Sequence, residues 1–508
     1  MILTDEEDPQ RIKDPPVTLT TIRYPERAVA RRPFSPLPDY ETSQALTFNS
    51  LNDSQSTIVK PPRRRRFLIW RAALISLVVY FFLTLVIGIP IILKKSASSY
   101  NDKYPYSALS SPSPWNGKST GSYYTPNINN ISSPTQQGID PVCNNWTVVA
   151  ALEGESIMQA SVEHVVSLNS QFSFTSNASY ITDAGIVLGG FYVDVNPDHT
   201  VQDTTVSIKM QTSSNSVFER TFVCFALSDN VTDLSLYVPA NLLSSDNILF
   251  NITLLFPQSP VPCEVDAFGT FLPLFYQHFG SLSNAVTFKK VTIGGPTSSI
   301  AAESLTVDQA FIETSMQPII GGFYVTDSLV LSTILAPIEA NITLYNDPGS
   351  PYPTFLHLDT GNSNLTAMVT LIAPNTGPPT RPNFIADMRT FYGTLSTTVA
   401  HDPSSPPTAI KLHTENGVGP SNVVLDEKFQ GVFQVTTKQA AAIVSQGNAM
   451  SIDPWNTGLQ RNMVASVNST ARMDGWIGWG SPPSWDPEQE GEVIVDSSLA
   501  DVTLFFRG

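Results

Sequence analysis

The chain has 508 residues, a formal net charge of −16 and only three cysteines. The charge is unevenly distributed: the first 95 residues carry 14 Lys and Arg against 9 Asp and Glu, whereas the rest carry 14 against 35, a net charge of −21. A region this acidic and this poor in Lys and Arg cannot neutralise a phosphate backbone, which excludes nucleic acid as a partner.

Residues 1–66 predict a disordered cytoplasmic tail, because they are rich in proline and charge and have no sustained apolar period. Within this tail, Leu37, Pro38 and Tyr40 resemble the LPxY variant of the motif that WW domains of ubiquitin ligases bind. A proline-favoured extended segment presents Tyr40 to an aromatic groove at little entropic cost. The motif predicts a WW-domain ubiquitin ligase as partner, and plain disorder is the alternative interpretation.

Residues 72–93 form an uncharged apolar run of 22 residues, which at about 1.5 Å per residue is long enough to cross a lipid bilayer. A cleaved signal peptide would be shorter and nearer the N-terminus, and a buried helix would carry a polar stripe. Arginines 63–66 precede the run, so the positive-inside rule places the N-terminus in the cytosol. We therefore predict a single-pass signal anchor over residues 67–95, in the plasma membrane, with the C-terminus extracellular.

Residues 96–140 are rich in Ser, Thr, Pro and Asn and predict an extended extracellular stalk. Beyond residue 140, short β-branched runs alternate with turn residues, and no long helical period occurs. This pattern predicts an all-β ectodomain of the β-solenoid or β-sandwich type.

A repeated phrase predicts two related units in the ectodomain. Residues 188–193, Leu-Gly-Gly-Phe-Tyr-Val, recur as residues 320–325, Ile-Gly-Gly-Phe-Tyr-Val. Shorter matches before and after them follow at nearly the same spacing, which indicates a duplication. We predict a first β domain over residues 141–312 and a second over residues 313–508.

The second unit has a shorter rhythm, in which phrases that begin at Leu331, Leu358 and Leu412 place an apolar residue two positions before a Thr. Successive rungs of a β-solenoid have this pattern. In these phrases residues 310–508 resemble the adhesin-like β ectodomain of fungal single-pass membrane proteins of unknown function, although Leu335 stands where that family has Asn. The resemblance implies an all-β fold at the cell surface and no particular activity.

All three cysteines, Cys143, Cys224 and Cys263, follow the apolar run, where an oxidising compartment permits a disulfide. We predict the pair Cys224–Cys263, because both fall in the same predicted domain. Three buried free thiols are the alternative.

Sequons of the form Asn-x-Ser/Thr predict N-glycosylation of the extracellular part. Beyond the apolar run they occur at Asn130, Asn145, Asn177, Asn230, Asn251, Asn341, Asn364 and Asn468.

The phrase Asp359-Thr360-Gly361 resembles the catalytic phrase of aspartic proteases. That chemistry needs two carboxylates that share a proton, and no second such phrase follows. The sequence also lacks a His-Glu-x-x-His zinc motif and a phosphate-binding loop. We therefore predict a protein that is not an enzyme and that needs no cofactor or metal.

A tryptophan cluster, Trp476 and Trp479 with Trp485 close by, has the potential to stack on sugar rings, and a hydrophobic plug at the end of a β stack is the favoured alternative. Together these features predict a non-enzymatic cell-surface glycoprotein whose adhesin-like ectodomain contacts cell-wall polysaccharide or another surface. The alternative function is a trafficking or signalling adaptor that acts through the LPxY-type motif of the tail.

Overall fold

The computed structural model describes residues 141–149, 157–167, 171–227, 231–348, 350–374, 382–447, 453–454, 458–482 and 491–507. All of them belong to one compact unit. This part of the chain is nearly all strand with one short helix, which confirms the predicted all-β class. Within these ranges no helix is long and apolar enough to cross a bilayer; the predicted tail, membrane span and stalk lie outside them.

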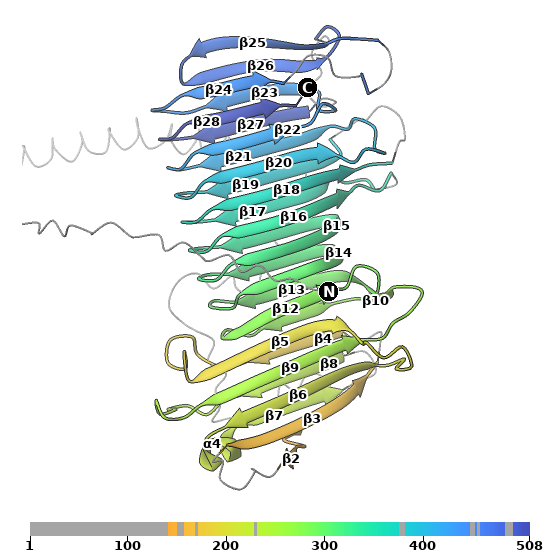
Figure 1. Cartoon of the computed structure of the whole chain (residues 1–508), viewed down its shortest axis with the longest axis vertical. Coiled ribbons are helices and arrows are strands. Elements are labelled where there is room, and N and C mark those ends of the chain that lie inside the picture. Colours follow the sequence, from red (N-terminus) through yellow and green to blue (C-terminus); the bar gives the residue numbers. More distant parts are fainter. Residues whose placement is uncertain are drawn as a thin grey trace, which may run out of the picture. The chain divides into compact units, whose positions relative to one another are not determined.

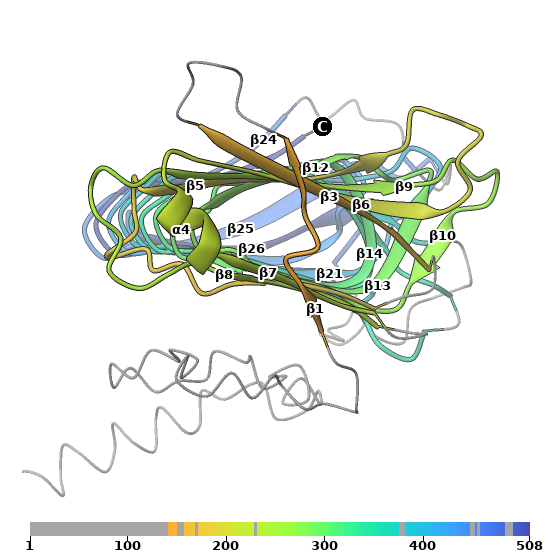
Figure 2. The same cartoon turned by 90° about the horizontal axis from the view of Figure 1, so that it is seen from below.

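The strands form two facing layers, seen from the side in Figure 1 and along the stack in Figure 2. In spatial order, layer one contains β2 (Thr147–Val149), β3 (Met158–Val166), β6 (Thr204–Thr212), β9 (Ile248–Phe256), β5 (Val187–Val195), β12 (Phe275–Ser281), the first parts of β14 (Ile300–Thr314) and β15 (Ile319–Thr333), β16 (Ile338–Tyr345), β18 (Leu365–Ile372), β20 (Leu395–His401), β22 (Ser421–Leu425), β28 (Val502–Phe506) and β24 (Ala442–Gln446).

Layer two contains β1 (Val142–Cys143), β7 (Phe222–Leu227), β8 (Val231–Tyr237), β4 (Gln171–Ser176), β11 (Phe268–Phe271), β13 (Val286–Gly295), the second parts of β14 and β15, β17 (Thr354–Thr360), β19 (Phe384–Thr390), β21 (Ile410–Asn416), β27 (Gly491–Ser497), β23 (Gly431–Thr436), β26 (Arg472–Trp479) and β25 (Arg461–Ser469), with β10 (Cys263–Val265) also beside β13.

In the middle of the stack, neighbouring strands run parallel and in register, and each rung contributes one strand to each layer. Side chains alternate strictly between the interior and the outer face, as in β17, because successive residues of a strand point to opposite sides. The predicted boundary between residues 312 and 313 falls inside β14, which pairs with both β13 and β15. The ladder therefore continues without a break from the first predicted domain into the second.

The interior between the layers is mainly apolar, and near its N-terminal end it is filled by phenylalanine rings. The Phe174 and Phe191 rings, one from each layer, lie 4.7 Å apart, and Phe268 lies within 6.3 Å of both. All three side chains are almost completely buried. Burial of each such ring stabilises the fold by about 2–3 kcal/mol, so this cluster is a main source of stability at this end.

A buried row of polar side chains runs along the corner where the layer-two strands end. Thr333, Thr360, Thr390 and Asn416 stand opposite one another in successive strand pairs. Their side chains bind turn carbonyls: for example, the Thr390 hydroxyl donates to the Ser363 carbonyl at 2.8 Å. The row explains why a Thr recurs at the end of each rung.

Two of the three rung phrases in the sequence are placed as expected. Leu331 and Leu358 are paired neighbours in β15 and β17. The third phrase, which begins at Leu412, is displaced by two residues. Leu412 pairs with Ala386, and Asn416 rather than Thr414 continues the buried row. The rung at β19 was not recognised in the sequence.

The two ends of the stack are antiparallel, unlike its middle. At the N-terminal end, β2, β3, β6 and β9 form an antiparallel series in layer one, and β1, β7 and β8 form one in layer two. The helix α4 (Asn215–Arg220) lies between the layers at this end (Figure 2) and begins where the Ser214 hydroxyl accepts from the Val217 N–H. At the C-terminal end, β26 and β25 add antiparallel to β23.

At both ends, the order of the strands in the stack differs from their order along the chain. The rung of β4 and β5 lies between the rung of β8 and β9 and the rung of β11 and β12. Likewise the rung of β27 and β28, the last strands of the chain, lies between the rungs of β21–β22 and β23–β24. The C-terminal strands therefore join the end of the stack to its middle.

Candidate functional site

An aromatic patch lies on the outer face of layer one, where β5 and β12 are neighbours. It consists of Tyr192, Tyr276 and His278, whose rings have centroids 6.0–6.3 Å apart. The register places Tyr192 opposite His278, with Tyr276 two residues before His278 and on the same face. The two tyrosines remain 37% and 39% exposed, so their rings are accessible to a ligand.

Two glycines allow one ring of the patch and a neighbouring carboxylate to lie flat on the sheet. A Cβ added at Gly190 would lie 2.5 Å from Cε2 of Tyr192, so that ring occupies the space above the glycine. A Cβ added at Gly280 would lie 2.7 Å from the Asp194 carboxylate in the same way. Any larger residue at these positions would lift the neighbouring side chain, so the glycines shape the surface.

Two carboxylates border the aromatic patch. Glu303 lies 3.8 Å from Nε2 of His278, and Asp194 covers Gly280. Burial, the neighbouring Tyr192 and the charge of Glu303 raise the pKa of Tyr276, so its hydroxyl stays a hydrogen-bond donor at neutral pH. Flat rings with donors and acceptors at their rim match a sugar ring, which has apolar faces and hydroxyls around its edge.

An ion-pair ladder lies on the outer face of layer two. Asp387 is at its centre and lies 3.3 Å from Nδ1 of His357, 3.3 Å from Nδ1 of His413 and 2.7 Å from Nη2 of Arg389. Nε2 of His413 is also 3.7 Å from Asp496. The side chains come from β17, β19, β21 and β27, because parallel in-register pairing places His357, Asp387 and His413 in one row.

The charges of this ladder stabilise one another. Burial opposes ionisation of Asp387, but the bonds from His357, His413 and Arg389 outweigh it and hold the pKa of the carboxyl far below its usual range. The hydrogen bonds to Asp387 and Asp496 raise the pKa of His413 to about 9. His413 is therefore protonated at neutral pH and acts as a cation rather than a base.

The protease-like phrase belongs to the regular rungs. Asp359 stands opposite Arg389 at the border of the ion-pair ladder, Thr360 belongs to the buried corner row, and the Gly361 N–H donates to the Thr333 carbonyl at 3.2 Å. A Cβ at Gly361 would lie 2.7 Å from the Ile334 carbonyl oxygen, so the rung needs this glycine. The phrase is thus explained by structure without a catalytic role.

The tryptophan cluster is buried, which agrees with the plug interpretation. Trp476 and Trp479 are only 7% and 5% exposed, and Trp485 lies outside the described residues. The guanidinium of buried Arg461 lies 5.8 Å from the centre of the Trp479 ring and donates to the Asp426 and Phe429 carbonyls. The rings therefore help close the C-terminal end and offer no exposed platform.

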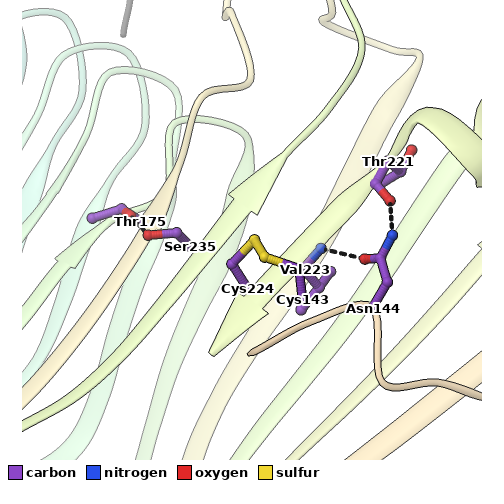
Figure 3. The surroundings of a disulfide bond; sticks show 7 residues. All are labelled: Cys143, Asn144, Thr175, Thr221, Val223, Cys224 and Ser235. Carbon is purple, nitrogen blue, oxygen red and sulfur yellow. Dashed lines mark hydrogen bonds between the residues drawn. A yellow bond between two sulfur atoms is a disulfide. The ribbon is translucent and has the colours of Figure 1, made fainter. Parts of the chain in front are cut away.

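The predicted Cys224–Cys263 disulfide is wrong, because Cys224 is bonded to Cys143 (Figure 3). These two residues face each other in the antiparallel pair of β1 and β7. Cys263 lies in β10, beside β13, and β8 and β4 separate that position from β7. At about 4.8 Å per strand the gap exceeds the reach of a disulfide.

The free thiol of Cys263 is half-buried and donates to the Ala285 carbonyl at 3.2 Å. Next to the disulfide, the Asn144 side chain accepts from the Val223 N–H at 2.8 Å and donates to the Thr221 carbonyl at 3.0 Å (Figure 3). These bonds and the disulfide together fix the two-residue strand β1 to β7.

Most described sequons are exposed and lie on strands or turns. The exposed asparagines are Asn145, Asn251, Asn341, Asn364 and Asn468. Asn177 is half-buried, with its side chain bonded to both backbone groups of Val238. Asn130 and Asn230 lie outside the described residues, as do Leu37, Pro38 and Tyr40 of the tail motif.

The two Gly-Gly-Phe-Tyr-Val phrases have matching neighbours. Both lie in layer one, in β5 and β15, and the second glycine of each faces the Asn of an Asn-Ile-Thr sequon: Gly190 faces Asn251 and Gly322 faces Asn341. On their other sides the phrases differ, because β15 has a register shift against β14 between Ala302 and Leu305.

The sequence matches no protein-family model and no curated protein sequence. Among solved structures, the chain is similar to a putative cell adhesion protein from Clostridium sporogenes, at 9% identity over 68% of this chain and 99% of that chain, with a TM-score of 0.15. A putative adhesin from Bacteroides fragilis has 10% identity over 68% and 96%, with a TM-score of 0.24. A putative lipid binding protein from Parabacteroides distasonis has 8% identity over 69% and 97%, with a TM-score of 0.21.

Proposed function

We propose that this chain is a non-enzymatic, single-pass cell-surface glycoprotein whose β ectodomain contacts polysaccharide through the aromatic patch. The observation that carries the proposal is the pair of half-exposed rings, Tyr192 and Tyr276, bordered by the carboxylates of Asp194 and Glu303. Aromatic faces pack on the apolar faces of sugar rings, while carboxylates accept from sugar hydroxyls. The acidic border favours neutral or basic sugars over acidic ones.

The membrane part of the proposal rests on the sequence. The uncharged residues 72–93 supply the span, the preceding arginines place the N-terminus in the cytosol, and the plasma membrane is the proposed location. The fold, an exposed β surface with sequons on it, suits an extracellular environment. The disulfide between Cys143 and Cys224 is of the kind that forms in an oxidising compartment.

Binding of the full-length protein to an array of neutral, basic and acidic polysaccharides tests the proposal. We expect Tyr192→Ala and Tyr276→Ala each to weaken binding about tenfold, since each lost ring removes about 1–1.5 kcal/mol of contact. Tyr392→Ala is the matched control, because Tyr392 is 65% exposed and lies in the turn between β19 and β20, far along the stack from the aromatic patch. Binding that survives both patch variants, or that Tyr392→Ala weakens equally, contradicts the proposal.

The topology has a separate test. An enzyme that removes N-glycans should increase the gel mobility of the full-length protein, and protease added to intact cells should remove the part after residue 95. An unchanged mobility together with a protected C-terminal part would show the opposite orientation.

A second candidate function is favoured by one observation, the Leu37-Pro38-Asp39-Tyr40 segment of the tail. As an adaptor, the chain would recruit a WW-domain ubiquitin ligase with a dissociation constant in the range of roughly tens to hundreds of micromolar, because the buried surface is small. Tyr40→Ala removes the ring that fills the groove and should lengthen the surface half-life in cells. An unchanged half-life would contradict the adaptor function and leave polysaccharide binding as the single proposed function.

A further inference from the structure

The C-terminal end of layer two has an open strand edge. Strand β25 is nine residues long and, in the part of the chain that the structure describes, pairs only with β26 on one side. Its other edge faces away from the stack, so another strand could add to its backbone groups. Val464 and Val467 are 55% and 67% exposed, which adds apolar surface to this edge.

The N-terminal end presents shorter unpaired edges than β25 does, because short strands cover part of β3 and β7. Its outermost strands, β1 and β2, have only two and three residues. The disulfide between Cys143 and Cys224 fixes β1 in place. Because β2 covers three residues of β3 and the other end strand, β24, has five residues, β25 is the longest strand whose whole outer edge is unpaired within the described residues. It is therefore the edge at which a second copy would add.

A sequon lies within this exposed strand. Asn468, followed by Ser469 and Thr470, is exposed and sits at the β-bulge between Val467 and Ser469. Its Nδ2 donates to the Asp474 carboxylate on β26, and a glycosylated amide keeps one N–H for that bond. A glycan here would project from the end of the edge strand, close to the exposed valines.

We propose that an N-glycan on Asn468 covers the β25 edge and prevents a second copy of this chain from pairing with it. A strand that adds to β25 must approach to about 4.8 Å, and a bulky hydrated glycan beside the edge prevents that approach. The bulge at Asn468 acts in the same direction, because it disrupts regular pairing. This inference rests on the extracellular location proposed above.

The test compares four variants of the full-length protein, made in eukaryotic cells and solubilised in detergent, and light scattering measures the mean protein mass of each. Asn468→Gln and Thr470→Ala both remove the sequon, and each should raise the mean protein mass about twofold or more. Asn364→Gln is the matched control: it removes an exposed sequon from the middle of the stack and should leave a monomer. Adding Val467→Lys to Asn468→Gln should restore the monomer, because a charge blocks edge pairing.

Glycopeptide mass spectrometry of the wild-type protein separates the ways in which the inference can fail. If Asn468 carries no glycan while other sequons do, the inference is overturned and the proposed function stands. If no sequon is glycosylated, the extracellular location fails as well. If Asn468 is glycosylated and both sequon variants stay monomeric, or if Asn364→Gln associates equally, the glycan does not protect the edge.

Discussion

His413 donates to Asp387 across the outer face of layer two, with Nδ1 of His413 3.3 Å from Oδ1 of Asp387. This pairing gives the first prediction. The folded-state pKa of His413, about 9, exceeds its ordinary value of 6.5. The ion pair therefore contributes its full stability below about pH 6.5 and loses it as the pH rises to about 9.

Because the His413 side chain is more than one-third exposed, solvent screening reduces this contribution to about 1 kcal/mol. The unfolding free energy of His413→Gln should therefore decrease less between pH 6.5 and 9 than that of the wild type. Denaturant titration at a series of pH values measures this difference. His199→Gln, at an exposed turn, is the control and should follow the wild-type curve. A His413 variant with the full wild-type pH dependence would refute this assignment.

The disulfide gives the second prediction. Cys143→Ser and Cys224→Ser should each lower the unfolding free energy by about 2–4 kcal/mol, because each opens a loop with a sequence separation of 81 residues. Cys263→Ser should cost less than about 1.5 kcal/mol, since a hydroxyl can keep the bond to the Ala285 carbonyl. Denaturant unfolding without reductant measures the unfolding free energy of all three variants. A larger decrease for Cys263→Ser than for the other two would contradict the Cys143–Cys224 pairing.

The third prediction concerns the close approach of two turns at Gly393. A Cβ at this position would lie far inside contact distance of the Ser363 carbonyl. Gly393→Ala should therefore destabilise the fold by about 2–3 kcal/mol as the turns are forced apart. Gly269→Ala is the control, because its nearest neighbour would be an oxygen at 3.8 Å; equal melting temperatures for the two variants would show that the turns adapt.

The fourth prediction separates Asp359 from catalysis. Asp359→Asn removes a charge next to Arg389 and should change the unfolding free energy by less than about 1 kcal/mol, as expected for a surface ion pair. Any proteolysis measured with the purified protein should be unchanged. Pepstatin-sensitive cleavage that disappears in the variant would restore the protease interpretation.

Much of the fold could be predicted from alternating apolar residues, because strands with one buried face have a period of two. The rung phrases at Leu331 and Leu358 were recognised because a buried Thr ends each strand. The phrase at Leu412 was misaligned because Asn416 performs there the role of Thr, binding the Gly393 and Pro420 carbonyls. Because either Thr or Asn can bind the turn carbonyls at the end of a rung, the sequence shows no single repeated residue at this position.

The features that depend on long-range register could not be predicted. Cys143 and Cys224 meet only because β7 crosses the end of layer two beside β1. The aromatic patch needs β12 beside β5, although Gly190 two positions before Tyr192 was a local sign of a ring lying flat. His357 and His413 join Asp387 only through the parallel pairing of three rungs.

The displaced rungs at the ends of the stack have a consequence for biosynthesis. During vectorial synthesis, residues 431–479 emerge before their docking partners, because β23 and β24 rest on β27 and β28, which are made last. The C-terminal end therefore cannot close by adding one rung after another in the order in which the chain is made. The rung of β27 and β28 must insert between two rungs that are made before it, so a stop codon before residue 491 would leave strands β23–β26 without the rung that joins them to the stack.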